Sequence, residues 1–316
     1  MKRIHKYQIA ELLLGIEAED KYLHPELADF EISSSEEPQI WIHLIKDVPA
    51  GTDHGTLLIQ SELIYIYENT DSYHIIYQSP LSSVYGYLLK KDSKQATVYI
   101  KDEVLNHGIE IMYSIRDAFF FYMQQYQRIA IHSASILYHD HVWLFSAPSG
   151  TGKSTHVNLW RKAGFPFRDF NGDVAVCYLS PEGIPLAAGL PWCGTSNIYH
   201  NEIAPLGGVI FLRQGQHNTI QASAPLEGVI QLTARCLTPS WNHDMMSKNL
   251  QVCQTLAGKI VLGNCLKNSL MKISCKIILL LIPLFLLLSV CGIVCYESNI
   301  HGYIAAGLKD DVLLLP

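Results

Sequence analysis

The chain has 316 residues and a formal net charge of −6. This length suffices for a large hydrophobic core and for two domains, and the acidic balance, without basic runs interleaved with aromatic residues, argues against a nucleic-acid-binding protein. The eight cysteines show no CxxC spacing and the fourteen histidines no HExxH pattern, so we expect free thiols in a reducing compartment and no structural zinc.

Residues 1–105 are predicted to form a β-rich N-terminal region. Strand-like stretches at 39–45, 63–67, 73–77 and 97–100 alternate Tyr, Ile and Val with polar residues, and turn-forming clusters separate them. This pattern favours a half-exposed antiparallel sheet. We find no catalytic constellation here, so we expect this region to pack against the rest of the chain or to present a substrate.

A helix and a hairpin are predicted next. Residues 108–127 place apolar side chains at helical spacing. Residues 129–137 and 142–146 are short apolar runs on either side of His139-Asp140, which predicts a β-hairpin.

The most informative segment is Ala147-Pro148-Ser149-Gly150-Thr151-Gly152-Lys153-Ser154, a phosphate-binding loop in which Ala147 stands where the full pattern has Gly. An apolar strand precedes it, and an amphipathic helix that Gly164 should end follows it, which is the order such a loop requires. The nucleotide-binding residues are expected to be Ser149, Gly150, Thr151, Gly152, Lys153, Ser154 and Thr155. Lys153 would reach the β- and γ-phosphates, and the Ser154 hydroxyl would bind Mg²⁺.

A carboxylate should complete the magnesium site. Residues 167–176 are predicted to return the chain to the sheet beside the loop, and Asp173 lies where an apolar run begins. We expect Asp173 to bind Mg²⁺, although the alternative that it only caps a turn stays open. Further on, the sequence predicts a hairpin turn at 180–183, an apolar strand at 208–212 and a helix at 227–237.

Five segments together are more specific than the loop alone. They are Ile131-His132-Ser133-Ala134-Ser135, the loop with its flanks from Leu144 to Trp160, Asn171-Gly172-Asp173, Gly189-Leu190-Pro191-Trp192-Cys193-Gly194-Thr195, and Val209-Ile210-Phe211-Leu212. This combination resembles the HPr serine kinase-related proteins, over about residues 129–261. The resemblance implies an α/β fold with the mixed-sheet P-loop domain of the HPr kinase and ATP-dependent carboxykinase type, here at residues 106–268.

The resemblance also implies an activity. Such proteins are ATP- and magnesium-dependent kinases, so it predicts transfer of the γ-phosphate to a serine or other hydroxyl of a small protein or peptide, with His132, Lys153 and Asp173 as catalytic residues. The acceptor is expected to be encoded nearby, a homo-oligomer is compatible with the family, and HPr itself is not expected as substrate. The family's first paired Asp is Gly172 here, so the alternative is a catalytically weak nucleotide-binding regulator or scaffold of a peptide-modification system.

The C-terminal part changes character. Residues 277–295 are an uncharged, Leu-rich run that follows three lysines, which predicts a transmembrane helix, with the catalytic domain on the cytoplasmic face of the cell membrane and residues 296–316 as a short tail. Three alternatives remain: a buried core helix, a purely cytoplasmic protein, and a fused reading frame that begins at Met271 and resembles a signal or lipoprotein leader.

Overall fold

The structure is a computed structural model that describes residues 2–49, 55–102 and 108–267. These residues fall in one compact unit, which spans residues 1–273, whereas a second unit, Ser274–Pro316, lies outside the described part. The predicted transmembrane segment 277–295, the tail 296–316 and the domain boundary at 105–106 also lie outside it. Within the described ranges, no helix has the length and apolar character needed to span a bilayer.

The N-terminal residues form an eight-stranded mixed sheet in the order β1-β2-β3-β8-β7-β6-β5-β4. Its strands are β1 (Arg3–Ile9), β2 (Leu12–Ala18), β3 (Ile40–Ile45), β4 (Thr56–Gln60), β5 (Ile64–Glu68), β6 (Ser72–Tyr77), β7 (Val84–Lys90) and β8 (Gln95–Ile100). The β-rich character is therefore confirmed. The expected antiparallel pairing holds for five of the seven strand pairs of this sheet, whereas β3 pairs in parallel with both β2 and β8.

The parallel pairing follows from the connection that precedes β3. After β2 the chain runs through two short 3₁₀ helices, η1 (Asp20–Tyr22) and η2 (Pro25–Phe30), before β3 begins. A connection of this length can bring the chain back to the end of the sheet at which β2 begins, so that β3 runs parallel to β2; a two-residue hairpin cannot do this.

The second sheet also has eight strands and carries the phosphate loop. Its order is β10-β9-β12-β13-β14-β16-β15, and β11 pairs with β9. The strands are β9 (Ile129–Tyr138), β10 (His141–Ser146), β11 (Arg168–Asn171), β12 (Val174–Leu179), β13 (Pro185–Ala188), β14 (Ile203–Gln214), β15 (Thr219–Ala222) and β16 (Val261–Lys267). The coarse prediction of a mixed α/β fold is confirmed.

Strand β14 changes partners along its length. Its first residues pair with β13, whereas Leu206 to Phe211 pair in parallel with β10 on one side and, from Gly208 onward, with β16 on the other. The strands β10, β9, β12, β13 and β14 therefore close into a ring.

The predicted hairpin at 129–146 is confirmed, and its turn has a clear cause. His139 and Asp140 have φ of 49° and 60°, and positive φ at both central residues is the geometry of the two-residue turn whose twist matches the flanking strands. Histidine and aspartate adopt this conformation more readily than most residues.

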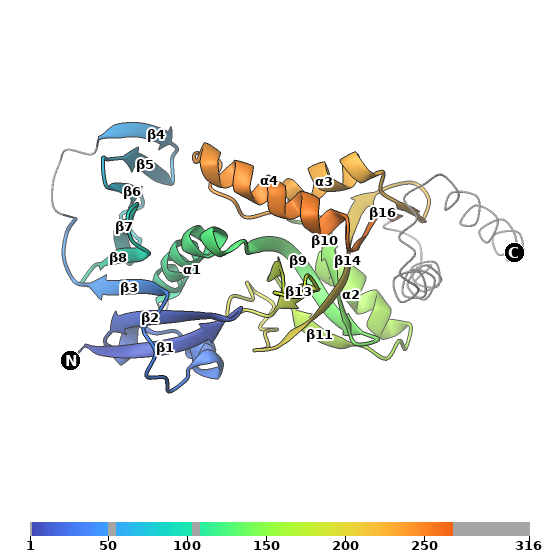
Figure 1. Cartoon of the computed structure of the whole chain (residues 1–316), viewed down its shortest axis with the longest axis horizontal. Helices are drawn as coiled ribbons and strands as arrows, with labels where there is room; N and C mark the ends of the chain where they lie inside the picture. The colour runs from blue at the N-terminus through green and yellow to red at the C-terminus, as the bar shows by residue number, and fades with distance from the viewer. Residues whose placement is uncertain (1, 50–54, 103–107, 268–316) are drawn as a thin grey trace, which may run out of the picture. The chain divides into compact units, whose positions relative to one another are not determined.

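Four α-helices lie in the described residues: α1 (Ile109–Met123), α2 (Lys153–Lys162), α3 (Pro225–Thr233) and α4 (His243–Ala257) (Figure 1). Helix α1 contacts β3, β7 and β8, α2 contacts β9 and β10, and α3 and α4 contact each other. One buried cluster joins the first sheet and α1 to Val174, Val176 and Tyr178 of β12, and a second joins the other residues of β12 to α3 and α4. Strand β12 therefore has a buried cluster on each face.

The predicted helix at 227–237 ends earlier than expected. Helix α3 stops at Thr233, and the next residues lie along β9 instead: the Leu237 N–H donates to the Ala130 carbonyl, and the His132 N–H donates to the Arg235 carbonyl. Backbone pairing with a buried strand has replaced the last helical turn.

Candidate functional site

The phosphate loop joins β10 to α2 in the order the sequence predicts. Gly150 and Gly152 have φ of 76° and 93°, and Gly152 is the N-cap of α2. Glycine adopts such angles without steric cost, so the backbone can turn sharply and direct the first N–H groups of the helix outward, where they suit an anion. The helix ends at Lys162, before Gly164 with φ of 78°, as predicted.

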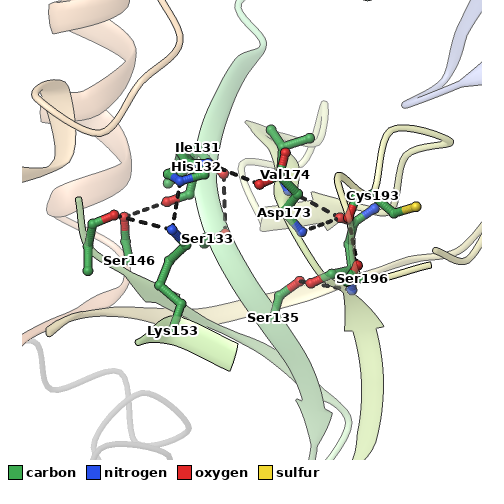
Figure 2. Close-up of polar contacts among 12 residues, drawn as sticks. Ile131, His132, Ser133, Ser135, Ser146, Lys153, Asp173, Val174, Cys193 and Ser196 are labelled. Atoms are coloured by element: carbon green, nitrogen blue, oxygen red, sulfur yellow. Dashed lines mark hydrogen bonds and ion pairs between the residues drawn. The ribbon is translucent and has the colours of Figure 1, made fainter. Parts of the chain in front are cut away.

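Lys153 and His132 are in direct contact. The Lys153 ammonium lies 2.6 Å from His132 Nε2 and 3.5 Å from the Ala147 carbonyl oxygen. On the other side of the imidazole ring, His132 Nδ1 lies 3.4 Å from Asp173 Oδ1 (Figure 2). The three residues predicted to be catalytic therefore form one chain of contacts. Because the ammonium has only hydrogens to donate, Nε2 is the acceptor and Nδ1 carries the ring proton.

The electrostatic environment keeps His132 neutral. Burial, and next the Lys153 charge, lower the pKa of His132, against the opposing effect of Asp173. Burial is also the main cause that lowers the pKa of Lys153. The His132 and Asp173 side chains remain 27% and 29% exposed, so a ligand can still reach them.

A kink between β11 and β12 places Asp173. Both strands pair with β9, and residues 172 and 173 lie between them, where the regular strand pairing with β9 is interrupted. The buried Asn171 side chain holds the interruption: its Oδ1 accepts the N–H groups of Asp173 and Val174 at 3.0 and 3.1 Å, and its Nδ2 donates to the Leu190 carbonyl at 2.8 Å. The prediction that Asp173 lies where a strand begins is therefore confirmed; whether it binds a metal stays a prediction.

Position 172 is sterically closed. A Cβ at Gly172 would lie far inside van der Waals contact with the Cβ and Oγ of Ser196. The Ser196 hydroxyl donates to the Cys193 carbonyl at 2.6 Å and accepts the Ile198 N–H at 3.2 Å. Ser196 thus occupies the space that a longer side chain at 172 would need, and its hydroxyl both donates and accepts a hydrogen bond there.

Asp169, three residues before Gly172, is held by an arginine. Its two carboxylate oxygens lie 2.8 and 2.7 Å from Nη2 of Arg161 on α2. The carboxylate is therefore engaged in an ion pair, although both residues line the same cavity as the loop.

The residues expected to bind a nucleotide surround a cavity of about 610 Å³, within the range of small-molecule sites. Those that line it are His132, Ser149, Gly150, Gly152, Lys153, Ser154, Thr155 and Asp173. Thr151 belongs to the loop but not to the lining, and its N–H donates to the Pro148 carbonyl at 3.3 Å.

The residues present fit a magnesium ion carried in with a nucleotide. Among the described residues there is no group of three or more His, Cys, Asp or Glu side chains that could hold a metal alone. Ser154 and Asp173 both line the cavity, and Ser154 is exposed. A hydroxyl and a carboxylate supply oxygen ligands, and Mg²⁺ usually takes only one or two ligands from the protein and the others from phosphates and water.

Sequence reasoning missed Arg235. This partly exposed residue follows α3, its carbonyl accepts the His132 N–H at 3.0 Å, and its charge contributes to the lowered pKa values of His132 and Lys153. No motif surrounds this arginine, so only the backbone pairing with β9 reveals that it belongs to the site.

Comparison of the chain with models of known protein families and with curated protein sequences gives no match.

Proposed function

We propose that this chain is an ATP- and Mg²⁺-dependent kinase that transfers the γ-phosphate to a serine or other hydroxyl of a small protein or peptide. The observation that carries the proposal is the contact of Lys153 with His132, at 2.6 Å, in a cavity shared with Asp173 and the phosphate loop. In the same proposal, the second sheet belongs to the mixed-sheet P-loop type of HPr kinases and carboxykinases.

In this proposal, positively charged groups bind the phosphates and oxygen-bearing side chains bind the metal ion. Lys153 and the N–H groups at the start of α2 would hold the β- and γ-phosphates, while the oxygens of Ser154 and Asp173 would hold the ion that travels with them. When bound, Mg²⁺ neutralises the charge that develops on the phosphates. The acceptor oxygen attacks the γ-phosphorus, the bond to the bridging oxygen breaks, and ADP leaves.

His132 is suited to take the acceptor's proton. Once Lys153 turns from His132 to the phosphates, Nε2 has a free lone pair, and the lowered pKa keeps the ring unprotonated at neutral pH. Phosphoryl transfer depends mostly on positioning and charge, so a neutral base of this kind can support it without a carboxylate at position 172.

A second candidate function rests on Gly172. Because Ser196 fills the space beside it, the site has no side chain at this position, and turnover could be lost while nucleotide binding remains. The protein would then be a nucleotide-binding regulator or scaffold of a peptide-modification system. Both candidates predict binding of ATP, and only the kinase predicts transfer.

The proposal extends to partners and location. We propose a peptide or small-protein acceptor encoded next to this gene, and attachment of the catalytic part to the cytoplasmic face of the cell membrane through residues 277–295. Recovery of the full-length chain in the membrane fraction would support this location, and recovery in the soluble fraction would contradict it.

The experiment is titration of the purified full-length protein with Mg²⁺-ATP, followed by incubation with γ-labelled ATP and candidate acceptors. We expect binding that Lys153→Ala abolishes and that the matched control Lys162→Ala, at the exposed end of the same helix, retains. Absence of ATP binding by the folded wild-type protein would refute both candidates. Binding without transfer above background would favour the regulator.

A further inference from the structure

Two cysteine thiols lie in contact behind the site. Cys236 Sγ and Cys253 Sγ are 3.5 Å apart. Cys236 is partly exposed in the segment after α3, whereas Cys253 is fully buried on α4. Neither residue lines the cavity or takes part in the chemistry proposed above.

One thiol of the pair is suited to react with an oxidant, and the other is suited to form the disulfide with it. The hydrogen bond between the two thiols is the main cause that lowers the pKa of Cys253, against the effect of burial, and the same bond together with burial raises the pKa of Cys236. Thiolates are the reactive form of cysteine, so Cys253 is the thiol suited to react first. Cys236 is partly exposed as a residue, whereas Cys253 is not, so an oxidant as small as hydrogen peroxide has to reach the Cys253 sulfur past Cys236. A disulfide requires sulfurs about 2.05 Å apart, so they would have to approach by roughly 1.5 Å, a shift that side-chain rotation and a small backbone movement can supply.

The backbone of Cys236 is attached to the site. Cys236 forms a bridge with Ile131 of β9, and the next residue, Leu237, donates its N–H to the Ala130 carbonyl at 2.9 Å. The preceding residue accepts the N–H of His132 at 3.0 Å. Residues 235–237 therefore run along the segment of β9 that contains His132. A displacement of the Cys236 backbone would thus be transmitted to His132, which contacts Lys153.

We propose that Cys236 and Cys253 are a site of reversible oxidation, and that their disulfide weakens nucleotide binding in the cavity. The thiolate of Cys253 attacks one oxygen of hydrogen peroxide, which breaks the O–O bond, gives a sulfenic acid and, after protonation, releases water. The sulfur of Cys236 then attacks the sulfenic sulfur, the S–S bond forms, and its proton leaves with the hydroxyl as a second water. Two thiols are oxidised and one peroxide is reduced to two waters.

The disulfide moves the Cys236 backbone towards α4 and strains the hydrogen bonds that its neighbours Arg235 and Leu237 make to β9. His132 then holds Lys153 in a different position, which lowers the affinity for ATP. This consequence rests on the proposed nucleotide-binding function, whereas disulfide formation itself does not. A thiol pair that stays reduced in most conditions and is oxidised by peroxide is the usual form of a regulatory disulfide in a reducing compartment.

The test treats the full-length protein with hydrogen peroxide and maps its disulfides by mass spectrometry without reduction. We expect a peptide that links Cys236 to Cys253, absent from Cys236→Ser and from Cys253→Ala, and retained in the control Cys265→Ser, which removes another buried cysteine. The oxidised wild-type protein should bind Mg²⁺-ATP at least about threefold more weakly than the reduced protein, dithiothreitol should restore the affinity, and Cys236→Ser should not respond to peroxide.

Two results would overturn the proposal: no Cys236–Cys253 link at peroxide concentrations that oxidise exposed thiols, or a complete link that leaves ATP affinity unchanged. Because Cys253 is buried, Cys236→Ser is the decisive variant, and circular dichroism shows whether each variant is folded. Failure of the reduced protein to bind ATP would count against the proposed function and the regulatory consequence, while the disulfide map would still report on the thiol pair.

Discussion

The contact between Gly172 and Ser196 makes a prediction that can be worked out from geometry. In Gly172→Ala, the new Cβ would lie well inside 3.0 Å of the Ser196 side chain, whereas its distance to Ile198 Cβ would be an ordinary 3.5 Å. Only Ser196 would have to move. Its movement would break the hydrogen bonds that its hydroxyl makes with the Cys193 carbonyl and the Ile198 N–H.

Forcing extra atoms into a packed position costs about 1–3 kcal/mol. Each kcal/mol corresponds to roughly 2–4 °C in melting temperature for a domain of 150–250 residues, and the compact unit here, residues 1–273, is slightly larger, so we expect Gly172→Ala to lower the Tm by roughly 2–12 °C. Ser196→Gly alone should cost about 0.5–1.5 kcal/mol for each hydrogen bond lost. In the double variant the clash disappears, so the two effects should be coupled by at least about 1 kcal/mol.

The assay is a double-mutant cycle by thermal and urea unfolding of the four proteins. Gly258→Ala serves as the control, since its φ is −74° and its nearest neighbour to a new Cβ is 3.7 Å away. If Gly172→Ala melts within a degree of the wild type, or if the two substitutions are additive, the steric account of position 172 is wrong.

Three further predictions concern the same site. The folded-state pKa of His132 is lowered, so the unfolded chain takes up this proton first, and stability should fall as the pH drops below about 6.5. The loss of Tm between about pH 7.5 and 5.5 should be smaller in His132→Gln, which removes the group, and in Arg235→Met, which removes one cause of the lowered pKa. An equal loss of Tm in the wild type and both variants would contradict this explanation. Asn171→Ala leaves the buried Val174 N–H and the partly buried Asp173 N–H without their acceptor and should cost about 2–5 kcal/mol by urea unfolding. The exposed Asn158→Ala should cost less than about 0.5 kcal/mol, and similar values for both would be evidence against the role of Asn171. On the proposed kinase function, Gly172→Asp combined with Ser196→Gly places a carboxylate at position 172 and should raise phosphate transfer by about 10²-fold or more without weakening ATP binding. Unchanged transfer would show that the absence of a carboxylate at this position does not limit the reaction.

The sequence predicts the elements that have strong local signals. Apolar alternation identified β3, β5, β6 and β8, and the Gly-rich loop between an apolar run and an amphipathic segment located β10 and α2 with their ends nearly correct. The His139-Asp140 turn was recognisable for the same reason, because its geometry depends only on its own residues.

Helix α4 was missed because its signal is weak. Its buried positions include Met245, Asn249 and Cys253, so an amide and a thiol stand where a periodic pattern would show aliphatic residues. The buried Asn249 is explained only by tertiary contacts, since its Nδ2 donates to Gln124 Oε1 and Thr238 Oγ1 at 2.6 Å each. No property of the helix alone predicts these partners.

The candidate site was predictable where one segment supplies its own chemistry. Lys153 belongs to such a segment, the phosphate loop. Asp173 was expected from its place before an apolar run and His132 only from the resemblance to a family, and the structure brings the three side chains together. Ser196 and Arg235 were not predictable, because each reaches the site through a loop whose course depends on backbone hydrogen bonds to another strand.

The change of partners along β14 has a consequence for when the site can form. This strand aligns with β10 through pairs such as Val142 with Leu206, and its other neighbour, β16, is the last described strand of the chain. Contacts between segments so distant in sequence form slowly, since a long loop must close before they gain any energy. During synthesis, β10, the strand that leads into the phosphate loop, can therefore pair with β14 only after most of the chain has been made. We expect ATP to bind only the completed fold and to act as a late stabiliser of newly made protein.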